Sequence, residues 1–114
     1  MEDCIFCKII NKEIPSAIIY EDEKVIAFND INPVAPVHVL IVPKFHVENV
    51  EALDGKSIEY VAAVHFAAQK IAKLMGINKK GYRLITNCGA EAGQTVMHLH
   101  YHLIGGITLG AKIY

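Results

Sequence analysis

The sequence predicts an α+β fold in which an antiparallel sheet of about five strands packs against one long helix. Three observations support this prediction. Most strand-like segments follow one another directly along the chain, and only one stretch has the apolar spacing of a long helix. The chain of 114 residues also has the usual size of one domain. Residues 1–114 are therefore expected to form a single domain.

The N-terminal part is expected to contain a short helix followed by three strands. Asp3 can cap a helix that runs to about Asn11, and Pro15 stops this segment because the residue before a proline avoids helical geometry. Apolar and β-branched runs predict strands at residues 17–20, 25–28 and 37–42. An acidic turn joins the first two strands, and a rigid loop with prolines precedes the third.

The C-terminal part is expected to contain the long helix and two more strands. Residues 56–75 have a set of side chains at helical spacing: Ile58, Val61, Ala62, His65, Ala68, Ile71, Ala72 and Met75. Gly76 lies where a C-terminal cap belongs. His65 shares the apolar face and is interpreted as a core histidine. Strands follow at residues 82–87 and 96–104, and the glycine-containing loop between them includes Cys88, which is interpreted as a loop residue.

The composition argues against several classes of protein. There are 11 Lys and Arg residues against 12 Asp and Glu residues, and Arg83 is the only arginine, so binding to nucleic acid is not expected. The chain has no apolar run of the roughly 18–20 residues that cross a membrane. The cysteine count is odd and the acidic N-terminus does not resemble a secretory signal, which favours a reducing compartment. A cytoplasmic protein is therefore expected.

The most informative stretch is the last predicted strand. Because alternate residues of a strand point to opposite faces, His98, His100 and His102 would share one face. The residues between and beside them would face the core: Met97, Leu99, Tyr101 and Leu103. A polar face that happens to use histidine is the alternative, although a face made wholly of histidine is improbable. One zinc ion does not fit all three, because His98 and His102 would be about 13 Å apart, and a Zn–N bond is only about 2.1 Å. The three histidines should therefore have different roles.

The loop before this strand, residues 87–95, could bind an anion. Its glycines would let backbone N–H groups approach a phosphate, and Thr95 adds a hydroxyl group. It is not a Walker loop, because no Gly-Lys-Ser/Thr follows. Taken alone, a plain hairpin turn is an equally good interpretation, and the loop gains significance by leading directly into the row of histidines.

The pattern His98-x-His100-x-His102, followed by Leu103 and Ile104, resembles the signature of the histidine-triad superfamily. Further motifs are similar to its nucleotide-binding Hint branch: Asn87, Gly93-Gln94-Thr95, Phe28-x-Asp30-Ile31-x-Pro33-x-Ala35-Pro36-x-His38 and Ile41-Val42-Pro43-Lys44-x-His46. The resemblance extends from about Cys4 to Gly106. Residues 107–114 depart from it, because they lack the Trp-containing tail that some members extend toward the partner's active site. The resemblance implies a HIT-like fold and a homodimer whose sheet continues across the interface, with the long helix and strand 82–87 at the contact.

The resemblance also implies an enzyme that hydrolyses purine nucleoside 5′-phosphoramidates through a nucleotidyl-histidine intermediate. His100 would be the nucleophile, His102 would assist at the phosphate and leaving group, His38 would lie in the same pocket, and Thr95 would neutralise charge on phosphate oxygens. A neutral imidazole, with an ordinary pKa near 6.5, can attack phosphorus without a separate strong base. A dinucleoside polyphosphate hydrolase of the same superfamily and a non-catalytic nucleotide-binding adaptor remain alternatives.

The expected ligand, by the same resemblance, is a purine nucleoside monophosphate such as AMP or GMP. Asp30 would accept hydrogen bonds from the ribose hydroxyls. The residues around the phosphate would be Asn87, Gly93, Gln94, Thr95, His100 and His102. The residues around the base would be Ile5, Phe6, Ile9, Phe28, Ile31 and Leu40.

The Cys4-x-x-Cys7 pair is a separate signal. Taken alone, it could be two core residues of an amphipathic helix. In zinc-containing relatives, two such cysteines join a histidine after the Pro-Lys turn and the first triad histidine, which correspond to His46 and His98. Two thiolates and two imidazoles leave no open coordination position, so the resemblance implies a structural Zn²⁺ site.

Overall fold

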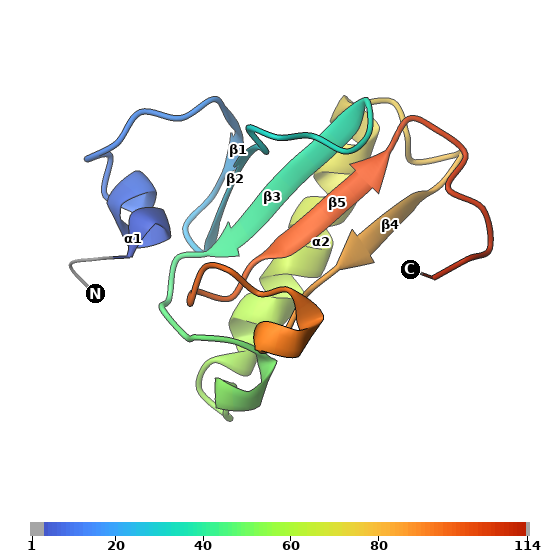
Figure 1. Ribbon diagram of the computed structural model, residues 1–114. Helices are drawn as coiled ribbons and strands as arrows, with labels where there is room; N and C mark the ends of the chain where they lie inside the picture. The colour runs from blue at the N-terminus through green and yellow to red at the C-terminus, as the bar shows by residue number, and fades with distance from the viewer. Residues whose placement is uncertain (1–3, 114) are drawn as a thin grey trace.

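The computed structural model describes residues 4–113, which form helices, strands and short 3₁₀ turns (Figure 1). The elements in chain order are α1 (Ile5–Ile10), β1 (Ile18–Glu21), β2 (Val25–Asn29), β3 (Val37–Pro43), α2 (Ile58–Leu74), β4 (Tyr82–Ile85) and β5 (Tyr101–Gly105). The 3₁₀ turns are Val50–Ala52 and Ala90–Ala92. Neither α1 nor α2 is long and apolar enough to cross a membrane.

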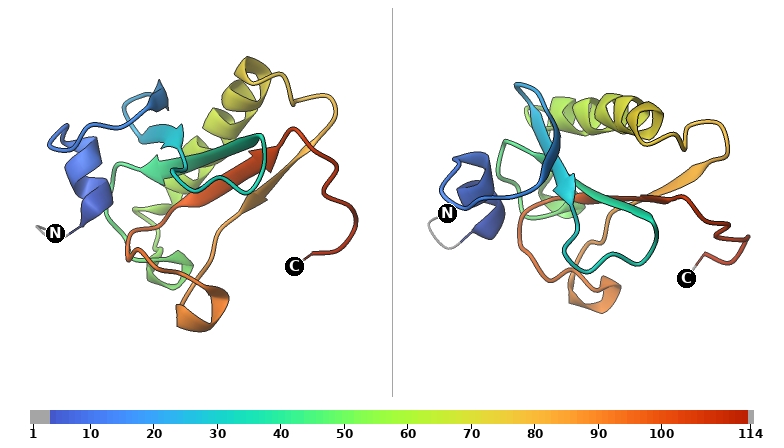
Figure 2. Two further views of the ribbon diagram at one scale, coloured as in Figure 1. Left: turned by 45° about the horizontal axis from the view of Figure 1, so that its top comes forward. Right: turned by 90° about the horizontal axis from the view of Figure 1, so that it is seen from above.

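The strands form one antiparallel sheet in the order β1-β2-β3-β5-β4. Figures 1 and 2 show α2 across one face of the sheet and α1 at the end of the sheet nearer β1 and β2. The predicted α+β fold, with a five-stranded antiparallel sheet and one long helix, is therefore confirmed. The edge strands are β1 and β4.

The sheet separates two hydrophobic clusters, because successive side chains of a strand point to opposite faces. Toward α2, the strands and the helix pack through Val25, Ala27, Val39, Ile41, Val64, Ala68, Ile71, Tyr101 and Leu103. On the opposite face, a smaller cluster joins α1 to the sheet through Phe6, Ile9, Ile26, Phe28, Leu40 and Val42. His102 pairs with Leu40 across β3 and β5, so the second face continues from this smaller cluster into the histidines.

The buried face of α2 differs from the prediction. The buried residues are Val64, Ala67, Ala68, Ile71 and Ala72, whereas Ile58 is 52% exposed and His65 lies on the exposed side. The interpretation of His65 as a core histidine was therefore wrong. The physical reason is that α2 has apolar side chains on more than one side, since Phe66 and Leu74 are exposed as well. Apolar spacing alone does not decide which side faces the sheet.

The last strand is shorter than predicted. β5 begins at Tyr101 rather than at residue 96, and β4 ends at Ile85 rather than at residue 87. Residues 94–100 therefore lie outside regular secondary structure, and the strict alternation of a strand does not govern them. Leu99 is buried as expected, but Met97 is 44% exposed, so its prediction as a core residue was wrong.

The start of α1 also differs in its cap. Cys4 is the N-cap residue, and its Sγ accepts a hydrogen bond from the backbone N–H of Cys7 at 3.3 Å. The cap predicted from the sequence, Asp3, lies outside the described residues. The thiol of Cys4 thus takes the place that an oxygen acceptor usually has at a helix start.

Candidate functional site

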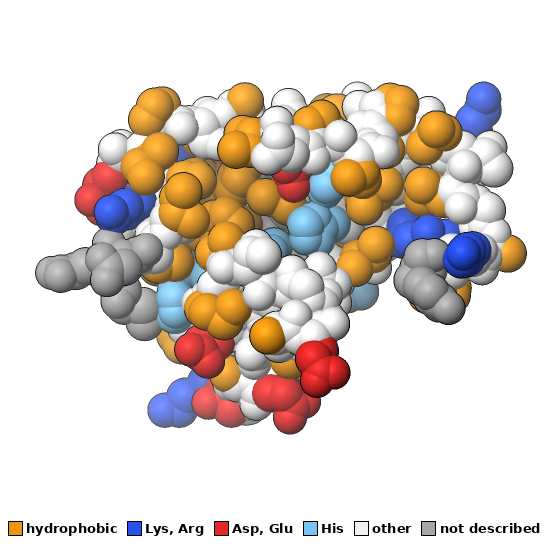
Figure 3. Space-filling view, in the orientation of Figure 1, with side chains coloured by type: hydrophobic (Ala, Val, Ile, Leu, Met, Phe, Trp, Pro, Cys, Tyr) orange, Lys and Arg blue, Asp and Glu red, His pale blue; other side chains and the backbone are white. Residues whose placement is uncertain are grey.

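The face of the sheet away from α2 carries His38 on β3 and His102 on β5, with His100 just before β5. Figure 3 shows histidine side chains beside a concentration of hydrophobic side chains. His38 and His100 are buried and His102 is half-buried. Ring centroids lie 5.3 Å apart between His100 and His102, and 5.2 Å apart between His102 and His38. The structure therefore brings these three predicted residues together.

Hydrogen bonds indicate which ring nitrogen carries the proton in neutral His38 and His102. The backbone N–H of Val34 donates to Nδ1 of His38 at 3.1 Å, so the proton of a neutral His38 ring lies on Nε2. This Nε2 then donates to Nδ1 of His102 at 2.9 Å and lies 3.4 Å from Oδ2 of Asp30. A neutral His102 ring consequently holds its proton on Nε2. Burial lowers the pKa of His102, and the charges of His100 and His38 lower it further, which favours this neutral ring.

The ring of His100 is oriented by its own backbone segment. Its Nδ1 donates to the carbonyl oxygen of His98 at 2.7 Å, because a carbonyl can only accept. The lone pair of a neutral His100 ring is then on Nε2. The ring of Phe6 packs edge-on against it with centroids 5.0 Å apart. An imidazole held in this way can act as a nucleophile through Nε2.

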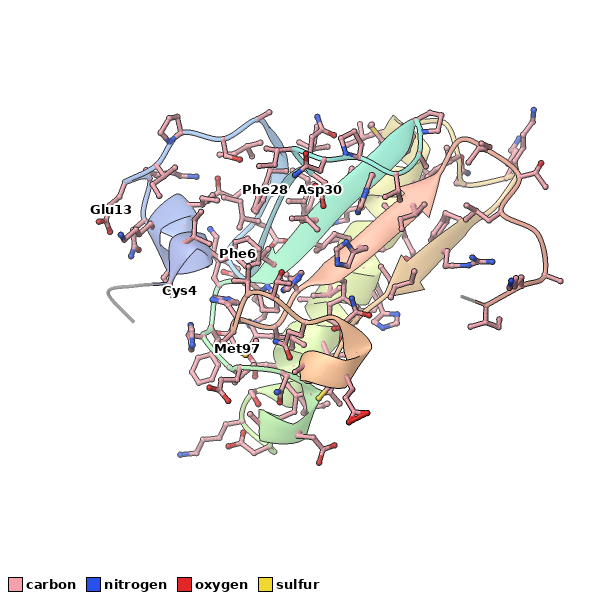
Figure 4. All side chains as sticks on the ribbon, viewed as in Figure 1. Cys4, Phe6, Glu13, Phe28, Asp30 and Met97 are labelled. Carbon is pink, nitrogen blue, oxygen red and sulfur yellow. The ribbon has the colours of Figure 1, made fainter. Side chains whose placement is uncertain are left out.

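Four of the six residues predicted around the base are buried together: Phe6, Ile9, Phe28 and Leu40. The other two, Ile5 and Ile31, are 46% and 92% exposed. Figure 4 shows Phe6, Phe28 and Asp30 on the same side of the sheet, and the two phenylalanine rings lie edge-on at 5.7 Å. The structure therefore provides an apolar wall with a carboxylate at its end, close to the histidines.

The side chain of Gln94 is occupied by protein partners. Its Oε1 accepts a hydrogen bond from the backbone N–H of Gly89 at 2.9 Å, and its Nε2 donates to the carbonyl oxygens of Glu48 and Val96 at 2.7 and 3.1 Å. Contact with a phosphate through this amide nitrogen would require the loss of one of these bonds. The side chain of Gln94 therefore holds the loop in place, and its position around a phosphate stays a prediction.

The other loop residues remain accessible. Asn87 is half-buried, Gly93 and Thr95 are exposed, and Gly93 has φ 87°, a backbone conformation that favours glycine. Thr95 lines a cavity of about 330 Å³ together with Cys4, Ile5, Val96 and Met97. A larger cavity of about 760 Å³ lies between β4 and residues 106–110, and none of the predicted site residues lines it. The larger cavity therefore does not mark the histidine site.

Cys4, Cys7, His46 and His98 form a second cluster, whose ligand atoms all lie within 4.8 Å of one another. Nδ1 of His98 lies 3.3 Å from Sγ of Cys4, 3.6 Å from Sγ of Cys7 and 3.1 Å from Nδ1 of His46, and Sγ of Cys7 lies 3.3 Å from the same His46 nitrogen. Nε2 of His98 donates to the carbonyl oxygen of Pro43 at 2.8 Å, so the lone pair of the neutral ring is on Nδ1 and points into the cluster.

The electrostatics of this cluster suit a metal ion. Burial lowers the pKa of His98 to about 4, so the ring is neutral at pH 7 and can act as a ligand. Burial and the neighbouring Cys4 raise the pKa of the Cys7 thiol to about 11, and a bound cation would favour its thiolate form instead. The four side chains could thus hold a metal ion, as the sequence suggested, and they connect α1 to the segment before β5.

Asp30, His38 and His102 form another group whose ligand atoms lie within 4.8 Å of one another. Here the hydrogen bond from Val34 to Nδ1 of His38 opposes metal binding, because it requires the proton on Nε2, the atom that would be the ligand. A hydrogen-bonded relay explains this group better than a metal site does.

Thr86 makes a contact with the histidine segment that the sequence pattern does not indicate. Its Oγ1 donates to the backbone oxygen of His100 at 2.9 Å, from the residue that follows β4. The only sequence signal was its position next to Asn87, at the end of a strand predicted to continue beyond it. This contact depends on where two strands stop, which the apolar pattern did not locate.

The chain belongs to the HIT domain family, whose pattern matches residues 11–109. It is similar to the purine nucleoside phosphoramidase of Escherichia coli K12, with 45% identity over 112 residues that cover 98% of this chain and 94% of that protein. It is also similar to a solved HIT family hydrolase from Clostridium thermocellum, with a TM-score of 0.97, 59% identity and coverage of 100% and 99% of the two chains. A histidine triad protein from Clostridium difficile gives a TM-score of 0.94, 49% identity and coverage of 98% and 97%. The resemblance to the histidine-triad superfamily is thereby confirmed.

Proposed function

We propose that this chain hydrolyses purine nucleoside 5′-phosphoramidates through a covalent intermediate on His100. The observation that carries the proposal is the orientation of the His100 ring, whose Nδ1 bond to the His98 carbonyl leaves the lone pair on Nε2. The E. coli relative, a purine nucleoside phosphoramidase at 45% identity, supports the substrate class.

The reaction would proceed in two displacements. Nε2 of His100 bonds to phosphorus as the P–N bond of the substrate breaks, and a protonated His102 ring gives its Nε2 proton to the leaving amine and becomes neutral. Water then attacks phosphorus, breaks its bond to His100, returns a proton to His102 and releases the nucleoside monophosphate. Backbone N–H groups of the loop and the hydroxyl of Thr95 would stabilise charge on the phosphate oxygens, which is a large part of catalysis in such transfers.

The nucleotide would lie along the face of the sheet that carries the histidines. Its base would contact the apolar wall that Phe6, Phe28 and Leu40 form, and its ribose hydroxyls would donate to the carboxylate of Asp30. The phosphate would then lie near His100 and His102, beside the loop with Asn87, Gly93 and Thr95. This placement is supported by the contacts on the face, where Phe6 packs against His100 and Asp30 lies beside His38.

The direct test is a turnover panel with an adenosine 5′-phosphoramidate, ADP and a diadenosine polyphosphate. We expect the highest kcat/KM for the phosphoramidate, with AMP and the free amine as products. Labelled nucleotide trapped in a single turnover should be found on the peptide that contains His100. A higher kcat/KM for the diadenosine compound would indicate a polyphosphate hydrolase instead. Binding of AMP without turnover of any of these compounds would indicate an adaptor.

We also propose that the Cys4, Cys7, His46 and His98 cluster holds one structural Zn²⁺. A tetrahedral zinc ion with bonds of about 2.1 Å to nitrogen and about 2.3 Å to sulfur separates its ligand atoms by roughly 3.3–3.8 Å. The separations of 3.1 to 3.6 Å between these ligand atoms lie close to that range. Four protein ligands leave no position for substrate, so the ion would stabilise the fold.

The three cysteines form no disulfide, and free thiols are typical of a reducing compartment. We infer that this compartment is the cytoplasm.

The homodimer is a further proposal. Ile58, Phe66 and Leu74 on α2 are 52%, 61% and 67% exposed, and β4 is an edge strand. Two β4 strands paired about a two-fold axis would continue the sheet and cover part of this apolar surface. Sedimentation at micromolar concentration should give twice the chain mass of 12.6 kDa, and Phe66→Glu should shift it toward one chain. A mass of 12.6 kDa for the unchanged protein would contradict the dimer.

A further inference from the structure

Thr86 follows β4 directly, and its side chain contacts the backbone of His100. Its Oγ1 donates to the carbonyl oxygen of His100 at 2.9 Å. The last backbone pair of β4 and β5 joins Ile85 to His102, so both Thr86 and His100 lie just beyond the end of this pairing. The side chain of Thr86 thus supplies a donor where the backbone ladder has ended.

The segment before β5 needs such contacts, because residues 94–100 have no regular secondary structure. The backbone N–H of Leu99 donates to the carbonyl oxygen of Val47 at 2.7 Å, and the ring of His98 donates to the carbonyl oxygen of Pro43 at 2.8 Å. These two bonds hold the segment as far as Leu99. The bond from Thr86 holds the peptide group of His100 itself.

The orientation of the His100 ring depends on this peptide geometry. Its Nδ1 donates to the carbonyl oxygen of His98, so the donor and the acceptor belong to one short segment. Rotation of the peptide group after His100 would move the Cα and Cβ atoms that carry the ring, and therefore Nε2. A displacement of about 1 Å at a reacting group can cost about 10²-fold in rate.

We propose that Thr86 is a positioning residue for His100, whose hydroxyl bond to the His100 carbonyl keeps Nε2 aligned with the phosphorus of the substrate. This inference rests on the proposed role of His100 as the nucleophile. Thr86 acts through the backbone of His100, so its loss should lower kcat and leave nucleotide affinity unchanged. Valine has the shape of threonine without the hydroxyl, and Thr86→Val therefore removes the hydrogen bond with little change in packing.

The test compares Thr86→Val with Thr86→Ser, which keeps the hydroxyl, and with Thr108→Val, an exposed position on the C-terminal segment. For an adenosine phosphoramidate we expect kcat of Thr86→Val to fall by about 10-fold or more, with the Kd for AMP within about two-fold of the unchanged protein. Thr86→Ser should recover most of this loss, and Thr108→Val should behave as the unchanged protein. A purely structural role would lower Tm in Thr86→Val and leave kcat of the folded protein unchanged.

A second measurement separates this inference from the proposed function. In protein labelled with ¹⁵N-histidine, the Nδ1 proton of His100 should exchange with water faster in Thr86→Val than in the unchanged protein or Thr108→Val. Failure of the unchanged protein to hydrolyse phosphoramidates would remove the proposed function, and the exchange rates would still decide the role of Thr86. Equal exchange in Thr86→Val, equal kcat in that variant, or an equal loss in Thr86→Ser would overturn the inference. If Thr86→Val does not fold, Thr86→Ala takes its place in both measurements.

Discussion

The two faces of the sheet are built on the same strands, but their side chains are held in different ways. Toward α2, Val39, Ile41 and Leu103 are fully buried among apolar neighbours, so shape and area hold them. On the other face, His38, His98 and His100 are buried as well, and each has at least one hydrogen-bond partner. Changes on the first face should therefore lower stability, and changes on the second should lower activity or metal content first.

The largest expected effect is that of His100→Ala. It removes the group that forms the covalent intermediate, so kcat for an adenosine phosphoramidate should fall by more than about 10⁴-fold. The Kd for AMP should change little, because Asp30 and the apolar wall remain. His102→Ala is the comparison variant and should be milder, at about 10²–10⁴-fold. Stopped-flow turnover and calorimetric binding give both quantities, and near-normal kcat in His100→Ala would defeat the mechanism.

Loss of the metal cluster should lower stability, although the cluster lies on the side of the sheet that carries the histidines. Elemental analysis should find about one zinc per chain, because the cluster provides four ligands. Cys4→Ala or treatment with a chelator should lower Tm, since metal that binds the folded chain stabilises it. Cys88→Ala is the matched control, because Cys88 lies outside the cluster. Purified protein without zinc, together with an unchanged Tm in Cys4→Ala, would contradict the site.

The apolar face can be tested through α2. Ile71 is fully buried and His65 is exposed on the same helix. Ile71→Ala should therefore lower the free energy of unfolding by about 2–5 kcal/mol, whereas His65→Ala should change it by less than about 0.5 kcal/mol. Urea titrations of both variants measure this difference. A similar loss in His65→Ala would restore the interpretation of His65 as a core residue.

The sequence alone predicted the sheet and the long helix, because these depend on patterns repeated over many residues, whereas the two histidine clusters were predicted from the resemblance to a known family. It failed for His65, because an apolar pattern on several sides of α2 fits more than one orientation. It failed for Met97, and it placed Thr86 inside a strand, because both positions depend on where β4 and β5 stop pairing. Strand ends are set by contacts between distant segments, such as the bond from Leu99 to Val47, and local spacing does not encode them.

The predicted site residues also divide into those whose grouping could be predicted and those whose role could not. Cys4, Cys7, His46 and His98 could be grouped from the resemblance, and the structure places their ligand atoms together. Gln94 was correctly located in the loop, but its hydrogen bonds run to the protein. An amide can bind a backbone or a phosphate equally well, so residue type and position in the sequence do not separate these two roles.

The smallest expected effect is a pH dependence that distinguishes the histidine face from the apolar face. Burial, and then the charges of His100 and His38, lower the pKa of His102 from its ordinary value of 6.5, and the carboxylate of Asp30 opposes them. An NMR titration of His102 should therefore have its midpoint below 6.5, and Asp30→Asn should lower that midpoint further.

The same shift in the pKa of His102 affects folding stability. Below pH 6.5 the unfolded chain binds the proton more readily than the folded chain, so His102 reduces stability as pH falls. The unchanged protein should then lose more stability between about pH 8 and pH 5 than His102→Gln does, because glutamine does not titrate. A midpoint above 6.5, or an equal loss in both proteins, would show that the charged form of His102 is not disfavoured on this face.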